Sequence, residues 1–182
     1  MKTAVLFLLF VLPLFSAGQI YIGKETEISF FAKSTIEDIS ASNKSVKPVL
    51  NPATGDLIIK IPNTGFQFQS SLMQEHFNEN YMESEKYPFS VFEGKLAEPV
   101  VCTREGKYPV TANGKLTIHG VTHDVSVMGT LTVKESEIDI HAEFSVLMTD
   151  YHIDVPGIKV NTPKDSETVN ITVQSTLIPY TK

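Results

Sequence analysis

Hydrophobic and polar residues alternate along most of this chain with a period of two. The clearest stretch is residues 138–148, where every even-numbered residue is apolar and most residues between them are polar. The same alternation recurs in four further segments, 26–33, 57–61, 125–133 and 169–177. A period of two sends alternate side chains to opposite faces of a β-strand, one buried and one in water. The pattern therefore predicts an antiparallel sheet.

Turn-forming sequences separate these segments at short intervals, among them NPATGD, EGK, ANG, HGVT and KESE. We count eight or nine candidate strands, and no long helical pattern lies between them. Many short strands joined by regular turns are typical of a β-sandwich or a closed barrel. Meandering strands in a chain of this length fit a barrel best, so we predict an all-β fold built as an eight-stranded antiparallel barrel.

One segment, residues 70–88, departs from the strand pattern. Its larger apolar side chains follow at intervals of four residues, at Met73, Phe77 and Tyr81. This spacing predicts a short amphipathic helix, and Ser71 with Gln74 three residues later resembles a capping box at its start. We expect the helix to lie across an opening of the barrel, with its aromatic stripe either packed in the core or touching a ligand.

A second irregular segment covers residues 149–167. It contains two prolines and many polar residues. We predict a long loop at one end of the sheet.

The first eighteen residues have the features of a secretory signal peptide. Lys2 is followed by an apolar run from residue 5 to 15 and by small residues at 16–18. This apolar run is too short for a membrane span. We therefore predict a cleaved signal at 1–18 and one barrel domain at 19–182, in the periplasm or secreted. No later window is apolar over the ~20 residues that an integral membrane helix needs.

The charge and cysteine content narrow the choice of partners. The formal net charge is −6, and the Lys and Arg residues are scattered without a basic stripe, which argues against nucleic acid as a partner. Cys102 is the only cysteine, so no internal disulfide can form. A sizeable hydrophobic core must stabilise the fold instead.

Motifs that carry catalysis are missing from the sequence. It contains no Gly-x-Ser-x-Gly nucleophile motif, no glycine-rich phosphate loop and no cysteine pair with metal-ligand spacing. Most carboxylates alternate outward on strands or lie in turns. We therefore predict a protein that is not an enzyme, with no catalytic residues and no cofactor.

His119 and His123 are spaced as two zinc ligands on a helix would be. However, one predicted strand ends before this pair and another begins after it, and Gly120 between them is free to take a positive φ angle. We interpret the histidines as residues that flank a turn, since no third ligand is placed by the spacing. A metal site at His119 and His123 is kept as a rival hypothesis.

The barrel interior is the remaining candidate site. An eight-stranded barrel is wide enough either to fill itself with side chains or to hold one slender ligand. A mixture of small and large inward residues can leave an apolar cavity, which suits a lipid-like guest. From the alternation and the aromatic clusters, we predict these lining residues: Phe66, Phe68, Met73, Phe77, Tyr81, Phe89, Leu131, Ile140 and Phe144.

Two segments, 71–96 and 108–133, resemble the YceI-like family. The first ends in a Tyr-Pro before an aromatic strand. The second resembles the family signature Gly-x-Leu-Thr-x-x-Gly-Val-Thr, which is matched here by Gly114, Leu116, Thr117, Gly120, Val121 and Thr122. The start of the mature chain differs from that of many members and is similar to a subgroup with a shortened N-terminal strand.

The resemblance implies a lipocalin-like barrel, exported from the cytoplasm, that binds a polyisoprenoid or a similar amphiphile along its axis. It implies no catalytic residues. It also changes the interpretation of Asn113-Gly114, a pair that by itself suggests a hairpin turn. In the family this glycine lies within a strand, so we expect a bulge or kink at Gly114.

We therefore expect an exported protein that transports, stores or sequesters a long-chain lipid. The main alternative is a filled barrel that acts in a structural or stress-related role through protein interactions. A homodimer is left open as the oligomeric state.

Overall fold

The computed structural model describes residues 19–33, 38–98, 100, 104–153 and 168–181. The predicted signal peptide, Cys102 and residues 154–167 of the predicted loop lie outside the described residues.

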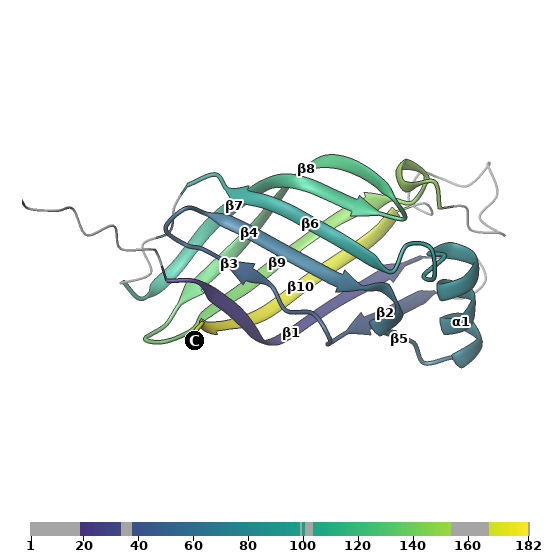
Figure 1. Ribbon diagram of the computed structural model, residues 1–182, viewed down its shortest axis with the longest axis horizontal. Coiled ribbons are helices and arrows are strands. Elements are labelled where there is room, and N and C mark those ends of the chain that lie inside the picture. Colours follow the sequence, from purple (N-terminus) through teal and green to yellow (C-terminus); the bar gives the residue numbers. More distant parts are fainter. Residues whose placement is uncertain (1–18, 34–37, 99, 101–103, 154–167, 182) are drawn as a thin grey trace, which may run out of the picture.

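The chain forms one antiparallel sheet that closes into an elongated barrel through pairing of its first and last strands (Figure 1). The strands are β1 (Tyr21–Ala32), β2 (Ile39–Asn43), β3 (Val49–Leu50), β4 (Asp56–Pro62), β5 (Phe66–Gln67), β6 (Phe89–Leu96), β7 (Gly106–Ile118), β8 (Val121–Val133), β9 (Ile138–Leu147) and β10 (Thr168–Pro179).

Ten strand segments occupy eight positions around the barrel. β2 and β3 both pair with β1, so together they occupy one strand position. β5 pairs with β2 and β4 pairs with β3, so β4 and β5 together occupy the next position. The interruption between β2 and β3 has a local cause. Asn43 Oδ1 accepts hydrogen bonds from the backbone N–H and the hydroxyl of Ser45, which turns the chain out of the ladder. The predicted eight-stranded barrel is thus confirmed.

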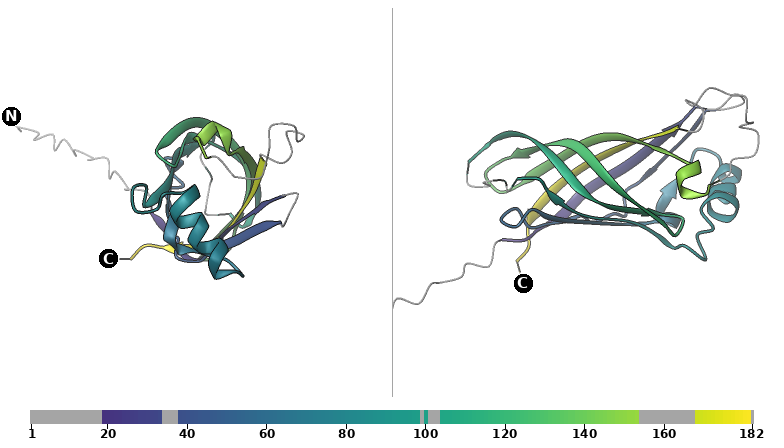
Figure 2. Two further views of the ribbon diagram at one scale, coloured as in Figure 1. Left: turned by 90° about the vertical axis from the view of Figure 1, so that its right-hand side faces the viewer. Right: turned by 90° about the horizontal axis from the view of Figure 1, so that it is seen from above.

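A short helical segment connects β5 to β6 and lies across one end of the barrel (Figure 2). It comprises α1 (Ser71–His76) and one π-helical turn, η2 (Phe77–Tyr81). The predicted capping residue was wrong by one position, because the Oγ of Ser70 rather than Ser71 accepts from the backbone N–H of Met73, at 3.4 Å. We call this end of the barrel the helix end and the opposite end the closed end.

The two ends differ in how completely they are packed. At the closed end Ile138 and Leu177 are both 0% exposed. Towards the helix end, inward residues of β9 and β10 such as Phe144, Val146 and Ile171 are only partly buried. The barrel is therefore filled at its closed end and more open inside near the helix.

Gly114 lies within strand β7, as the family resemblance implied, but the expected bulge is absent from its pairing. The pairing of β7 runs in continuous register with β6 and with β8, and Gly114 pairs with Gly94 and Val125. Glycine is needed there because the strands approach closely, since a Cβ on Gly114 would lie 2.4 Å from the carbonyl oxygen of Glu93 and 2.5 Å from the Cα of Gly94.

Candidate functional site

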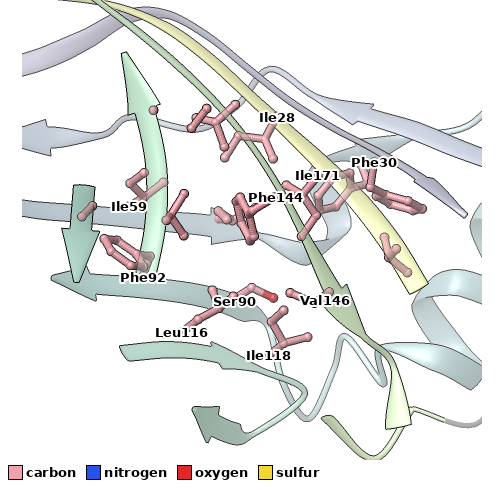
Figure 3. A pocket seen from close by; sticks show the side chains of 18 of the residues that line it. Ile28, Phe30, Ile59, Ser90, Phe92, Leu116, Ile118, Phe144, Val146 and Ile171 are labelled. Carbon is pink, nitrogen blue, oxygen red and sulfur yellow. The ribbon is translucent and has the colours of Figure 1, made fainter. Parts of the chain in front are cut away.

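A cavity of about 210 Å³ lies inside the barrel, towards the helix end (Figure 3). Its wall consists almost entirely of aliphatic and aromatic side chains, and the described lining contains no Asp, Glu, Lys or Arg. Burial, together with the nearby Asp150 carboxylate, raises the pKa of the Tyr151 hydroxyl in this wall, so this phenol is uncharged at neutral pH. Such a cavity can hold an apolar group and has no ion to pair with a charged one.

Most of the predicted lining residues lie in the wall of this cavity. These are Phe66, Phe68, Met73, Phe77, Tyr81, Leu131, Ile140 and Phe144. They come from β5, the segment after it, the helical segment, β8 and β9. Their proximity to the cavity is thus a property of the fold, and their contact with a ligand stays a prediction.

Phe89 is the exception, and its prediction was wrong. Its side chain faces outward, is 39% exposed and lies under Lys60, whose Nζ is 3.8 Å from the ring centroid. The inward residues of β6 are Ser90, Phe92 and Leu96. Glu93 is a charged residue of the same strand, and counting back from it in steps of two places Phe89 on the outer face too. Phe89 was instead assigned to the interior because of the aromatic Tyr-Pro-Phe sequence.

The sequence-based prediction also missed much of the aliphatic wall. Figure 3 shows several of the side chains that surround the cavity, including Ile28, Ile59, Phe92, Leu116, Ile118 and Ile171. Each of them lies in a strand, at a spacing of two from other buried residues, so the alternation contained the signal. The prediction was drawn mainly from aromatic clusters and therefore left these residues out.

Small side chains create the space in the middle of the barrel. Gly129 of β8 pairs with Ala142 of β9, which pairs with Val173 of β10, and all three line the cavity. One step nearer the closed end, Leu131 pairs with Ile140, and both are buried. The interior is therefore wide at the layer of Gly129 and Ala142 and narrows at the next layer.

Four phenylalanines fasten the helical segment to the barrel. Phe77 stacks on Phe30 of β1 at 5.7 Å between ring centroids and meets Phe66 and Phe68 at 5.5 and 5.0 Å. Aromatic pairs at these distances are favourable beyond the area they bury. The helical segment is thus held over the cavity as a cap.

A buried asparagine fixes the return from the helical segment into β6. Asn63 is 0% exposed, its Nδ2 donates to the carbonyl oxygen of Tyr87 at 2.6 Å, and its Oδ1 accepts from the Ser90 hydroxyl at 2.9 Å. Ser90 lines the cavity, but its hydroxyl already donates to Asn63. Its O–H is therefore not free to donate to a ligand.

The pairing of β8 with β9 extends only from the closed end to Gly129 and Ala142 in the described residues. Beyond this point a short 3₁₀ turn, η3 (Thr149–Tyr151), contacts both strands. These residues lie outside the strands, as the loop prediction expected, but Tyr151 is buried and lines the cavity. The Tyr151 ring is part of the cavity wall, and its backbone carbonyl oxygen contacts the ring of His119.

His119 and His123 hold η3 against the β7–β8 hairpin. His123 Nε2 lies 2.9 Å from the carbonyl oxygen of Asp150, and His119 Nδ1 lies 3.2 Å from that of Tyr151. His119 Nε2 also meets Glu83 Oε2, just after the helical segment, at 2.7 Å. The histidines therefore connect the hairpin to both segments that cover the helix end.

The turn itself consists of His119 and Gly120, with φ angles of 50° and 75°. Two positive φ angles are typical of a tight hairpin whose twist matches the strands. The interpretation of His119 as a residue beside the turn was thus wrong, because it is in the turn. As for the metal hypothesis, no group of three or more His, Cys, Asp or Glu residues able to hold an ion occurs in the part of the chain that the structure describes.

Replacing His119 with Asn should loosen the helix end. Asn tolerates the positive φ angle but is too short to reach both Glu83 and Tyr151, so we expect a loss of about 1–2 kcal/mol in the free energy of unfolding. Amide hydrogen exchange should become faster at residues 149–153. His76→Ala is the control, since His76 is exposed on α1. Unchanged exchange at 149–153 would contradict this role of His119.

A closed antiparallel barrel with a short helix across one end is the lipocalin-like fold class. A model of the YceI-like domain matches residues 22–177 of this chain. The chain therefore belongs to the YceI-like family, as its sequence motifs indicated.

Solved structures share this fold at low sequence identity. BcnA from Burkholderia cenocepacia is 16% identical with a TM-score of 0.67, and the match covers 83% of this chain and 95% of that chain. A polyisoprenoid-binding domain from Saccharophagus degradans, implicated in plant cell wall breakdown, is 13% identical with a TM-score of 0.72 over 88% and 98%. The Campylobacter jejuni YceI protein is 16% identical with a TM-score of 0.57 over 76% and 81%.

No match was found among curated protein sequences. Within the described ranges, no helix has the length and apolar character needed to cross a membrane.

Proposed function

We propose that this protein binds the hydrocarbon chain of a polyisoprenoid or a similar long-chain lipid inside its barrel. The observation that carries the proposal is the cavity wall, which is almost entirely apolar and contains no Asp, Glu, Lys or Arg in its described part. Removing a chain from water is favourable by about 0.8 kcal/mol for each CH₂ group, so a wall without reactive groups is sufficient for affinity. The similarity to the Saccharophagus degradans domain, which is a polyisoprenoid-binding domain, supports the same class of ligand.

We further propose that the protein acts after export, in the periplasm or outside the cell, where it carries, stores or sequesters the lipid. The support is the signal-like sequence of residues 1–18. The role is binding rather than catalysis.

Organic extraction of protein purified from its native host, followed by mass spectrometry, tests this proposal. We expect a lipid with a long apolar chain in near-stoichiometric amount. Extracts without lipid, together with no uptake of polyprenol by the protein, would refute it.

A variant that fills the cavity provides the matching binding test. Ala142 points into the cavity at its widest layer, so Ala142→Phe should raise the dissociation constant for polyprenol by at least about tenfold, because the ring takes the place of ligand carbons. Titration with a polyprenol, followed by calorimetry, measures the constant. Glu143→Phe is the matched control, since the same ring on the same strand then faces solvent. Equal binding by Ala142→Phe and the unmodified protein would place the ligand elsewhere.

A further inference from the structure

We propose that the cavity is a blind pocket that takes the apolar end of the chain first, and that Leu131 and Ile140 form its floor and limit the chain length that is buried. This inference rests on the proposed lipid binding and adds to it an orientation and a determinant of chain length. The evidence is the order in which inward side chains follow one another along the barrel, which can be read from the pairing of neighbouring strands.

The floor lies one layer below the widest part of the cavity. Gly129 and Ala142 pair across β8 and β9, and the next inward residues towards the closed end are Leu131 and Ile140. Both line the cavity, and Leu131 is 2% exposed. The layer of Gly129 and Ala142 is thus followed directly by two large aliphatic side chains, which narrow the barrel interior.

Along β8, β9 and β10 the barrel is filled below the floor. The next inward residues, Val133, Ile138 and Leu177, are buried and do not touch the cavity. In the floor layer itself, Ser175 pairs with Ile140, and the hydroxyl groups of Ser175 and Thr26 hydrogen-bond to each other at 2.7 Å. On the side formed by β8, β9 and β10, a chain that enters from the helix end therefore stops at Leu131 and Ile140, and on β3, β4 and β6 the lining also includes Leu50, Leu57 and Leu96.

The orientation follows from the polarity of the wall. A hydroxyl or a charged head group at the floor would lose its water without a hydrogen-bond partner, which is costly. At the helix end, by contrast, the backbone carbonyl groups of η3 and the histidines of the hairpin are close to the rim. The head of the ligand therefore stays at the helix end, and the tail occupies the blind end.

The size of the cavity supports partial burial of a long chain. Its volume of about 210 Å³ is below the ~300–1,000 Å³ common for small-molecule sites. Only the terminal part of a polyisoprenoid fits in such a space, and the rest of the chain extends out of the cavity past the cap.

A homologous series of linear alcohols, each one methylene longer than the last, tests the floor by calorimetric titration. For the unmodified protein we expect the affinity to rise about fourfold for each added methylene and then to level off at one chain length. Leu131→Ala should move this break to longer chains, and Ala142→Val should move it to shorter ones. Val46→Ala is the control, because Val46 is buried but does not line the cavity, and its break should stay in place. If Leu131→Ala does not fold, the single variant Ile140→Val takes its place and should also move the break to longer chains, while the single variant Ala142→Val still moves it to shorter ones.

The orientation is tested with α,ω-diols of the same lengths. The second hydroxyl would reach the floor, so we expect at least about tenfold weaker binding than for the matched alcohol. Binding without a break, a break that none of the lining variants moves, or diols that bind as well as alcohols would overturn the blind pocket while leaving lipid binding intact. No binding by any alcohol or polyprenol would overturn the proposed function and this inference together.

Discussion

Gly114→Ala should destabilise the protein by about 4 kcal/mol, the largest loss we expect from adding a single methyl group to this chain. The added Cβ would lie 2.4 Å from the backbone oxygen of Glu93 and 2.5 Å from the Cα of Gly94. Both obstacles are backbone atoms, which cannot rotate away as a flexible side chain can. Relief therefore requires β6 and β7 to move apart, which breaks hydrogen bonds in the barrel wall.

Urea denaturation followed by circular dichroism measures this loss. Asn113→Ala is the control, because its side chain is exposed on the same strand and little change is expected. A loss below about 1 kcal/mol for Gly114→Ala would mean that β6 and β7 can separate locally at little cost.

The same glycine shows what could be predicted from the sequence. Alternation alone identified the strand of β9 and its inward residues, because Ile138, Ile140 and Phe144 share one parity and the charged residues share the other. Together with the turn sequences, it gave a count of eight or nine strands, and eight strand positions are observed. It did not give the reason for glycine at 114, since the close contact with Gly94 joins residues that are distant in the sequence. A local turn rule suggested a hairpin there, whereas the family pattern correctly placed Gly114 within a strand but led to the expectation of a bulge.

The candidate site was predictable to a similar extent. The aromatic residues of the helical segment could be placed over the barrel because their spacing of four is a local property. Phe89 was misplaced because an aromatic ring can also lie on the outer face, here under the ammonium group of Lys60. The role of His119 depends on Glu83 and on the carbonyl group of Tyr151, which come from segments on either side of it in the chain. Such contacts between distant segments leave no periodic signal.

The division of the barrel interior into a filled end and a hollow end could likewise not be predicted from the sequence. Strand alternation marks Leu177 and Ile171 alike as inward residues, although the first is fully buried and the second borders the cavity. The difference arises from which side chains meet across the bore. Gly129 next to Ala142 leaves space, whereas Leu131 next to Ile140 removes it.

Phe77→Ala should lower the free energy of unfolding by about 3 kcal/mol and release bound lipid faster. Phe77 is the centre of the aromatic cluster, with ring centroids of Phe30, Phe66 and Phe68 within 5.0–5.7 Å. Alanine favours helix more than phenylalanine does, so a loss of stability here reports the lost packing rather than a weaker helix. Because the cluster holds the cap over the cavity, its removal lets the helical segment detach more often.

Stopped-flow displacement of a fluorescent polyprenol measures the release rate, and urea denaturation measures the stability. Leu72→Ala is the control on the same helix, because Leu72 is 58% exposed and does not line the cavity. Faster release from Phe77→Ala but not from Leu72→Ala is expected if the ligand leaves beneath the helical segment. If Phe77→Ala is destabilised and its release rate is unchanged, the ligand leaves by another route. The cover formed by η3, where β8 and β9 separate beyond Gly129 and Ala142, is then the next candidate, because His119 and His123 hold it through only a few hydrogen bonds.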